Sequence, residues 1–347
     1  MTSETTRRLK VAVDPVSADD RRAVDEAAAL VAAGRLVAFP TETVYGLGAD
    51  ATSAAAVARV YAAKGRPARN PLIVHAPDAE QGLRIARADD RARLLASLFW
   101  PGPLTMVMNR RADCRIADAA TAGGPTVAVR VPALSAARAL IKAAGVPMVG
   151  PSANRSGHVS PTTADHVLAD LNGRIAAVLD AGPCPVGVES TVIDLSGPQM
   201  RVLRPGAVTI SMLRAALGTD DPAGSLDSAD LPADDGLSAL PSPGMLGSHY
   251  APRHAVRLDA TAPLPGRREV LLAFGPPPPG FARVLQLSAD ARPREAARRL
   301  YALLRTADGL DVDGIAVAPL QLPAADPDGE ILAALADRLG RAAAPRD

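Results

Sequence analysis

The sequence contains little cysteine, few aromatic residues and almost no net charge, and each scarcity excludes a class of protein. Its two cysteines, Cys114 and Cys184, are too few to staple a secreted fold with disulfides. They also lie far apart and show no metal-ligand spacing. Aromatic residues make up only 3% of the chain, so Ala, Val and Leu must fill the core. Because 38 basic and 37 acidic residues give a net charge of +1, any anion binding must depend on local groups.

Long apolar runs are also absent. No stretch approaches the roughly 18 apolar residues that a membrane-spanning helix needs, and residues 1–10 lack the apolar core of a signal peptide. We therefore expect a cytoplasmic protein that contacts no membrane. The 347 residues exceed what one hydrophobic core usually serves, which favours two domains.

Helical and strand patterns alternate along the chain. Apolar residues at helical spacing predict helices over residues 19–33, 53–64, 89–98, 135–144 and 163–171. Runs rich in β-branched residues predict strands over residues 35–39, 71–75, 105–108, 126–131, 147–150, 176–180 and 190–194. This order predicts an α/β fold, with a mixed sheet favoured over a strictly parallel one.

The composition changes near residue 218. Residues 218–247 consist largely of Asp, Pro, Gly, Ser and Ala, which is typical of a linker. A shorter α/β pattern follows, with strands predicted over residues 269–274, 283–287 and 314–318 and helices over residues 292–305 and 330–343. This pattern predicts a second, smaller domain.

Two segments combine cations or hydroxyl groups with residues that fix the backbone. Residues 64–66 (Lys-Gly-Arg) follow a predicted helix, where the cations either offset the helix dipole or face a ligand. A fixed ammonium and guanidinium suit a triphosphate. Ser152, Asn154 and Ser160 are either neutral donors to phosphate or ribose oxygens or caps of the following helix. Arg204 either binds an anion or pairs with Glu189.

Familiar nucleotide and hydrolase motifs do not account for these segments. The glycine-rich loop at residues 39–48 can present backbone N–H groups to a ligand, and residues 46–51 satisfy the pattern G-x-G-x-x-A. No acidic residue follows about 20 positions later to hold a ribose, which argues against a dinucleotide site. Ser152 lies in G-x-S-x-N rather than in a nucleophile elbow, and no G-x-x-x-x-G-K-[ST] motif occurs.

Eight motifs, in order between residues 35 and 209, together resemble the Sua5/YrdC/YciO family. They are residues 40–48 (PTETVYGLG), 63–67 (AKGRP), 70–75 (NPLIVH), 100–105 (WPGPLT), 126–130 (TVAVR), 151–154 (PSAN), 186–191 (VGVEST) and 203–206 (LRPG). Residues 242–245 and 249–252 resemble the linker of the long, two-domain Sua5 type. The resemblance implies a twisted mixed sheet around a large cavity and a small Rossmann-like C-terminal domain. The expected boundaries are 1–216 for the catalytic domain, 217–252 for a linker that crosses the cavity, and 253–347 for the C-terminal domain.

The resemblance also implies a nucleotidyltransferase reaction. L-threonine, bicarbonate and ATP would give threonylcarbamoyl-AMP, pyrophosphate and water, and a tRNA threonylcarbamoyl transferase would use the product to modify adenosine 37 of tRNA (t6A37). Mg²⁺ is expected to accompany ATP, without a metal site made by protein side chains alone. The alternative is an RNA-binding protein of the YrdC/YciO type that lacks this activity, although the small net charge argues against an extended RNA surface.

The family's site residues carry over by position. Its ATP contacts fall on Lys64, Arg66, Asn70, Thr126, Ser152, Asn154, Ser160, Arg204 and Gly247. Its threonine contacts fall on Thr43, His75, Arg130, Gly150 and Ser190. Lys64 and Arg66 are also the expected catalytic residues, because negative charge grows on phosphate oxygens during the reaction.

Two departures from the family pattern concern this site. Leu246 and Gly247 replace a usual Lys-Tyr pair, so a linker that covers the nucleotide would have to use backbone or Tyr250. Gly150 stands where alanine is usual, and little effect on the site is expected from that change.

Overall fold

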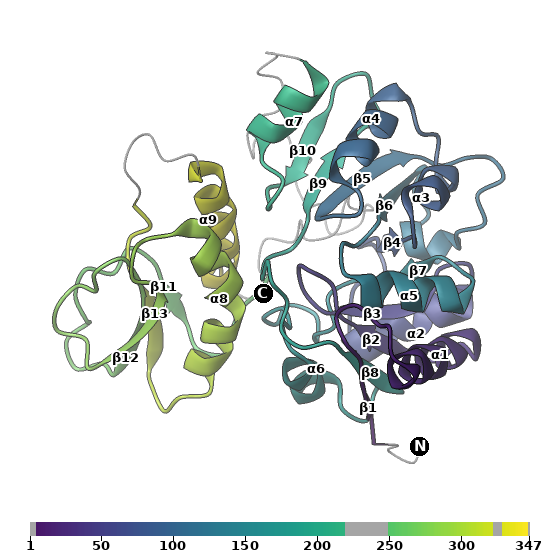
Figure 1. Cartoon of the computed structure of the whole chain (residues 1–347). Helices are drawn as coiled ribbons and strands as arrows, with labels where there is room; N and C mark the ends of the chain where they lie inside the picture. Colours follow the sequence, from purple (N-terminus) through teal and green to yellow (C-terminus); the bar gives the residue numbers. More distant parts are fainter. Residues whose placement is uncertain (1–4, 219–248, 322–327, 346–347) are drawn as a thin grey trace.

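The computed structural model describes residues 5–218, 249–321 and 328–345, which form two sheets covered by helices (Figure 1). Within these residues the larger sheet has ten strands in the order β1-β8-β2-β3-β7-β4-β6-β5-β9-β10, and the smaller has four in the order β11-β14-β12-β13. The larger sheet mixes parallel pairs such as β4 with β6 and antiparallel pairs such as β5 with β6. The strand pairs of the smaller sheet are parallel. Both the α/β class and the mixed sheet confirm the prediction from sequence.

The strands of the larger sheet are β1 (Arg7–Lys10), β2 (Val37–Phe39), β3 (Gly46–Asp50), β4 (Ile73–His75), β5 (Leu104–Asn109), β6 (Thr126–Arg130), β7 (Met148–Val149), β8 (Ala177–Asp180), β9 (Thr191–Asp194) and β10 (Arg201–Arg204). The helices packed with it are α1 (Ala18–Ala32), α2 (Ala54–Lys64), α3 (Ala79–Ile85), α4 (Asp90–Phe99), the 3₁₀ helix η1 (Asp118–Thr121), α5 (Ser135–Ala144), α6 (Ala164–Leu171) and α7 (Ile210–Leu217). The C-terminal part contains β11 (Val256–Arg257), β12 (Glu269–Phe274), β13 (Arg283–Ser288), α8 (Pro293–Asp308), β14 (Gly314–Val317) and α9 (Gly329–Ala343).

The glycine-rich segment expected to be a loop is in part strand β3, and this corrects the prediction. Gly46 and Gly48 are both buried in the centre of the sheet, between β2 and β7. A Cβ atom on Gly48 would lie 2.8 Å from the carbonyl oxygen of Val37 and 2.4 Å from Cε of Met148. The two glycines therefore allow neighbouring strands to pack closely, and their N–H groups belong to the sheet.

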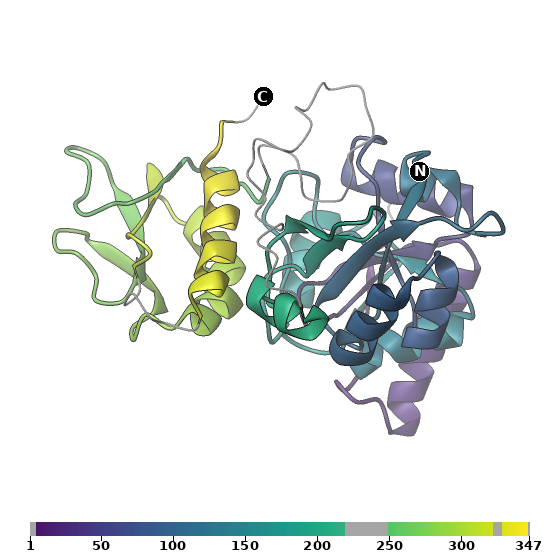
Figure 2. The same cartoon turned by 90° about the horizontal axis from the view of Figure 1, so that it is seen from above.

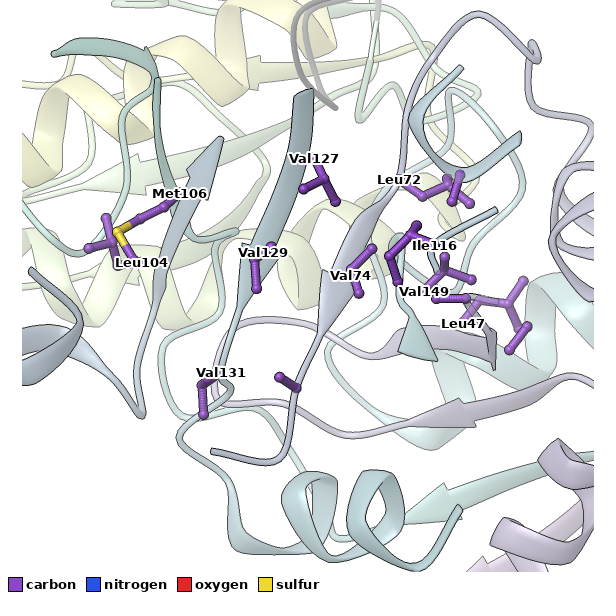
Figure 3. Packing of buried hydrophobic residues seen from close by; sticks show 14 of the residues in the cluster. Leu47, Leu72, Val74, Leu104, Met106, Ile116, Val127, Val129, Val131 and Val149 are labelled. Atoms are coloured by element: carbon purple, nitrogen blue, oxygen red, sulfur yellow. The ribbon is translucent and has the colours of Figure 1, made fainter. Parts of the chain in front are cut away.

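Alternation along the central strands separates the main core from a polar face. Figure 3 shows Val127, Val129 and Val131 pointing into the core beside Val74. Side chains alternate across a strand, so the even-numbered residues of β6 lie on the opposite face, where Ala128 packs with Ile73 of β4. The same face carries His75 at the end of β4 and Arg130 at the end of β6, and we call it the polar face.

The C-terminal part packs on the N-terminal part through its two helices. In Figures 1 and 2, α8 and α9 lie between the smaller sheet and the rest of the molecule. The contact is close, because a Cβ atom on Gly187 would lie 2.4 Å from Cα of Arg298 in α8. Arg305 of α8 also forms a 2.7 Å ion pair with Asp170 of α6.

None of the helices within the described residues is both long enough and apolar enough to pass through a bilayer.

The packing of β3 predicts that Gly48→Ala lowers the free energy of unfolding by about 1–3 kcal/mol, because the added methyl group meets backbone that cannot move away. Urea unfolding measures the change. Gly340→Ala in α9 is the matched control, since nothing lies within 4 Å of its Cβ position. Because alanine favours the helix more than glycine does, Gly340→Ala should instead raise the free energy of unfolding by about 0.5–1 kcal/mol. Equal effects of the two substitutions would contradict the packing argument.

Candidate active site

A cavity of about 50 Å³ lies where β4, β6, β7, β9 and β10 begin or end. Its walls are formed by Thr43, Val44, Arg66, Ile73, Arg130, Gly150, Pro151, Ser152, Glu189, Ser190, Arg204, His249 and Tyr250. Residues from both predicted sets line it together. Those from the ATP set are Arg66, Ser152 and Arg204, and those from the threonine set are Thr43, Arg130, Gly150 and Ser190.

Lys64 joins the two segments that the sequence singled out. It ends α2, where Gly65 adopts a left-handed conformation with φ of 63° and turns the chain. Its Nζ donates to the carbonyl oxygens of Ser152 at 2.5 Å and Asn154 at 2.6 Å. Burial, aided by the charge of Arg66, holds the pKa of the Lys64 ammonium well below its usual value. Lys64 thus fixes the loop that follows β7.

Arg66 is held by the loop that precedes β4. Its Nη2 donates to Oδ1 of Asn70 at 2.5 Å and to the carbonyl oxygen of Pro71 at 2.9 Å. Burial lowers the pKa of this guanidinium to about 10, so it stays charged at neutral pH. Asn70 lies behind Arg66 rather than in the wall of the cavity, and its buried Nδ2 has no hydrogen-bond partner among the described residues.

Arg204 approaches the cavity from the end of β10. It donates through Nε to the carbonyl oxygen of Ser190 and through Nη2 to the hydroxyl of Ser190, both at 3.1 Å. That hydroxyl in turn lies 2.8 Å from the hydroxyl of Thr105 in β5. Two predicted residues from different sets, Arg204 and Ser190, are therefore in direct contact.

Arg130 ends β6 on the polar face of the sheet and is paired with a carboxylate that sequence reasoning did not assign to the site. Its Nη2 lies 2.7 Å from Oε1 of Glu42, and both side chains are almost fully buried. The other oxygen of Glu42 accepts the backbone N–H of Ala133 at 2.9 Å. Glu42 lies inside the PTETVYGLG motif, so its place in that motif is the feature of the sequence that could have assigned it to the site.

His75 ends β4 next to Arg130 and is neutral. Burial, followed by the charge of Arg130, lowers the pKa of its imidazole to about 3. Its Nδ1 is buried and lacks a hydrogen-bond partner in the described part of the chain. A Cβ atom on Gly150 would lie 2.7 Å from this Nδ1 and 2.9 Å from Cζ of Phe39. Contrary to expectation, an alanine at position 150 would therefore have to displace His75 or Phe39.

Other predicted residues lie outside the cavity wall. Asn154 donates to the carbonyl oxygens of Arg155 and His158, while its Oδ1 is buried without a partner. Ser160 donates to Oε1 of Glu189 at 2.7 Å, so it reaches the cavity only through that carboxylate. Thr126 begins β6 and is about 13 Å from its other end, where Arg130 lies. Gly247 lies outside the described residues.

His249 and Tyr250 form the wall beside the cations. Both side chains are buried, with ring centroids 4.2 Å apart. Burial, followed by the charges of Arg66, Lys64 and Arg204, holds the pKa of His249 well below its usual value. Within the described residues, the hydroxyl of Tyr250 and Nδ1 of His249 have no hydrogen-bond partner. The sequence suggests Tyr250 only as a replacement for the tyrosine that the family usually has at position 247, and it gives no role to His249.

The chemistry of the cavity is cationic. Arg66, Arg130 and Arg204 lie in its wall, and Lys64 is buried behind it, two residues before Arg66. Of the accompanying carboxylates, Glu189 lies in the wall and Glu42 pairs with Arg130 from outside it. Within the described part of the chain, no group of three or more His, Cys, Asp or Glu side chains could hold a metal ion. Such a site favours an anionic ligand over a protein-bound cation.

Family models match both parts of the chain. The Sua5_yciO_yrdC model, described as "Telomere recombination", matches residues 29–206, which is more than half of the chain. The chain belongs to the Sua5/YrdC/YciO family. A second model, described as "Threonylcarbamoyl-AMP synthase, C-terminal domain", matches residues 208–344. The Sua5-type resemblance inferred from the motifs is thereby confirmed.

Two curated members of the family are similar in sequence. The threonylcarbamoyl-AMP synthase of Bacillus subtilis (strain 168) is 44% identical over 244 residues, which cover 69% of this chain and 67% of that relative. The threonylcarbamoyl-AMP synthase of Pyrococcus abyssi is also 44% identical over 229 residues, covering 65% of this chain and 64% of that relative. The matches thus span about two thirds of these relatives.

A solved structure of the family matches almost the whole fold. The crystal structure of P. abyssi Sua5 complexed with L-threonine superposes with a TM-score of 0.84 at 34% identity. The match covers 97% of this chain and 98% of that chain.

The surroundings of His75 predict that its ring stays neutral throughout the physiological range. In nuclear magnetic resonance spectra of protein with labelled histidine rings, the His75 signals should keep their neutral position between about pH 8 and pH 5. The His75→Asn variant identifies the signals by their loss. Since the folded-state pKa is lowered, this group reduces stability as the pH falls below its unfolded value of about 6.5. A titration midpoint above pH 5 would contradict the described burial.

Proposed function

We propose that this chain is a threonylcarbamoyl-AMP synthase, which converts L-threonine, bicarbonate and ATP into threonylcarbamoyl-AMP, pyrophosphate and water for t6A37 synthesis in tRNA. The observation that carries the proposal is the set of buried cations in and beside the wall of one cavity, where Glu189 is the one carboxylate among the described wall residues. Burying such charges is costly unless an opposite charge compensates them. A triphosphate supplies that charge.

The nucleotide half of the proposed site consists of the ATP set. Arg66 and Arg204 would bind phosphate oxygens through their guanidinium groups, because both lie in the cavity wall on fixed hydrogen bonds. Lys64 would bind as a point charge after exchanging its present carbonyl partners for phosphate. Ser152, Asn154 and Ser160 would donate or accept hydrogen bonds, and the unpartnered Oδ1 of Asn154 and Nδ2 of Asn70 favour this. Thr126 and Gly247 stay in the proposed set on family resemblance alone.

The threonine half would lie on the polar face of β4 and β6. Arg130 would hold the substrate carboxylate, with Glu42 fixing its guanidinium from behind. His75 would stay neutral, so that it does not add charge beside the threonine amine. The Thr43 hydroxyl and Ser190 would bind the substrate's polar groups, and Gly150 would leave room for His75.

Positioning and electrostatics account for the proposed chemistry. A carbamate oxygen attacks the α-phosphorus and pyrophosphate leaves, so negative charge grows on phosphate oxygens and on the leaving group. Lys64, Arg66 and Arg204 would stabilise this charge. Holding threonine and ATP in one cavity makes the reaction effectively unimolecular, and no covalent enzyme intermediate is required. Mg²⁺ would be held by the phosphates of ATP, since the cavity offers few carboxylates.

The proposed division of the chain makes residues 1–216 the catalytic domain, 217–252 a linker across the cavity and 253–347 the C-terminal domain. His249 and Tyr250, at the end of this linker, support the proposal because they line the cavity. A space of about 50 Å³ is too small for ATP, and ligand sites commonly exceed about 300 Å³. Both side chains would have to move when the nucleotide binds. Their unpartnered polar atoms make this displacement less costly.

The proposed cell compartment is the cytoplasm, where the free thiols of Cys114 and Cys184 would stay reduced. The product would pass to a tRNA threonylcarbamoyl transferase. An RNA-binding protein without synthase activity is not favoured, since the family relatives with matching sequences are named as synthases. Any RNA binding would be weak and local.

The function is tested by incubating the protein with ATP, threonine and bicarbonate and identifying the adenylate by mass spectrometry. Threonylcarbamoyl-AMP should form only when all three substrates are present. Omission of each substrate is the control. Release of pyrophosphate without threonine, or salt-dependent RNA binding without any adenylate, would contradict the proposal.

The proposed phosphate contacts predict that Lys64→Ala and Arg66→Ala each lower the rate of pyrophosphate release by at least about 100-fold. The reason is the loss of a cation where charge develops on phosphate. Lys142→Ala, an exposed lysine on α5, is the control and should retain full activity. Circular dichroism checks that each variant folds. Unchanged release in both site variants would place the chemistry elsewhere.

A further inference from the structure

Glu189 connects the cavity to the C-terminal helices. It lies in the cavity wall, where its Oε1 accepts the hydroxyl of Ser160 at 2.7 Å. Its Oε2 accepts the hydroxyl of Tyr301 in α8 at 2.7 Å and Nε of Arg338 in α9 at 3.1 Å. One carboxylate thus takes one hydrogen bond from the proposed nucleotide site and two from the C-terminal part.

This network is poorly suited to a purely stabilising role. Arg338 is completely buried and Glu189 is nearly so, and a buried ion pair often gains no more than its desolvation costs. Burial alone would raise the pKa of Glu189, but Arg338 and Arg204, with the Ser160 and Tyr301 hydroxyls, hold it below the usual value. Glu189 is therefore charged, and its orientation is fixed from two sides.

Arg338 and Tyr301 also contact the residue that closes the cavity. The ring of Tyr250 stacks on that of Tyr301 at 5.6 Å, and the guanidinium of Arg338 lies 5.9 Å from the Tyr250 ring. Nη2 of Arg338 is buried and has no hydrogen-bond partner among the residues that the structure describes, and the same holds for the hydroxyl of Tyr250. If Tyr250 is displaced by the nucleotide, Arg338 and Tyr301 lose their contacts with its ring but keep their hydrogen bonds to Glu189.

We propose that Arg338 and Tyr301 are positioning residues of the nucleotide site, which orient Glu189 and, through it, hold the Ser160 hydroxyl so that its oxygen is left to accept a hydrogen bond from ATP. This inference rests on the proposed function. On this proposal helices α8 and α9 contribute to nucleotide binding, although neither Tyr301 nor Arg338 lines the cavity. Because the network reaches the ATP set and not Arg130 or His75, its loss should weaken ATP binding and leave threonine binding unchanged.

A simpler role for these residues would be to hold the two parts of the chain together. Glu330 provides the comparison, because it lies on the same helix α9 and accepts the backbone N–H of Ser211 in α7 at 3.1 Å. Glu330→Gln weakens this contact between the parts without touching Glu189. A docking role predicts similar effects of the Glu330 and Arg338 variants, whereas a positioning role predicts different ones.

The test measures kcat, the KM values for ATP and threonine, and the ATP dissociation constant by calorimetry. Tyr301→Phe removes one hydroxyl and should raise KM and Kd for ATP roughly three- to tenfold. Arg338→Met should raise them by about tenfold or more, and Arg338→Lys should restore part of the loss. The KM for threonine should not change in these variants. Glu330→Gln should leave all these constants unchanged, even where it lowers the melting temperature.

A double-mutant cycle tests the path through Glu189. Ser160→Ala and Tyr301→Phe should show non-additive effects on ATP binding, because both act on one carboxylate. Additive effects, equal shifts in both KM values, or a Glu330→Gln variant that matches Arg338→Met would overturn the proposal. Wild-type protein that forms no adenylate would instead overturn the proposed function, and the calorimetric ATP constants would still decide the role of Arg338 and Tyr301.

Discussion

The buried positive charge at one cavity is the constraint on which the rest of the structure depends. Lys64, Arg66, Arg130 and Arg204 come from three separate segments of the chain, and each is almost fully buried. Neutral oxygens and the carboxylate of Glu42 hold these groups in place, so that they do not turn toward solvent. The sheet supplies the rigidity, because Arg130 and Arg204 both end strands. A site built in this way favours a polyanion whose charge completes it.

The C-terminal part takes part in this arrangement. Its helices supply Tyr301 and Arg338 to Glu189, and the segment leading into it places His249 and Tyr250 beside the cations. With these two side chains in place, the remaining cavity is small. The same segment that connects the two parts would therefore also control the room available to the nucleotide. Synthesis of an adenylate benefits from such a closed site, because water is excluded from the reacting groups.

The sequence predicted most of the secondary structure and the residues that gather at the cavity, because both depend on local patterns and ordered motifs. It failed where long-range packing decides. The glycines of β3 have the sequence pattern of a ligand-binding turn, but the reason for glycine at position 48 is close packing against Val37 and Met148. Helix α7 and strand β10 were not predicted, and strand β1 is short and polar. No local signal pairs Glu189 with Arg338, because 149 residues separate them along the chain.

The measurement that tests the central claim most directly is a crystal structure with a non-hydrolysable ATP analogue and threonine. The triphosphate should lie within hydrogen-bond distance of Lys64, Arg66 and Arg204, with the side chains of His249 and Tyr250 displaced. The threonine carboxylate should meet Arg130. A nucleotide bound elsewhere, while His249 and Tyr250 still fill the space beside the cations, would contradict the claim that this buried charge exists to bind ATP.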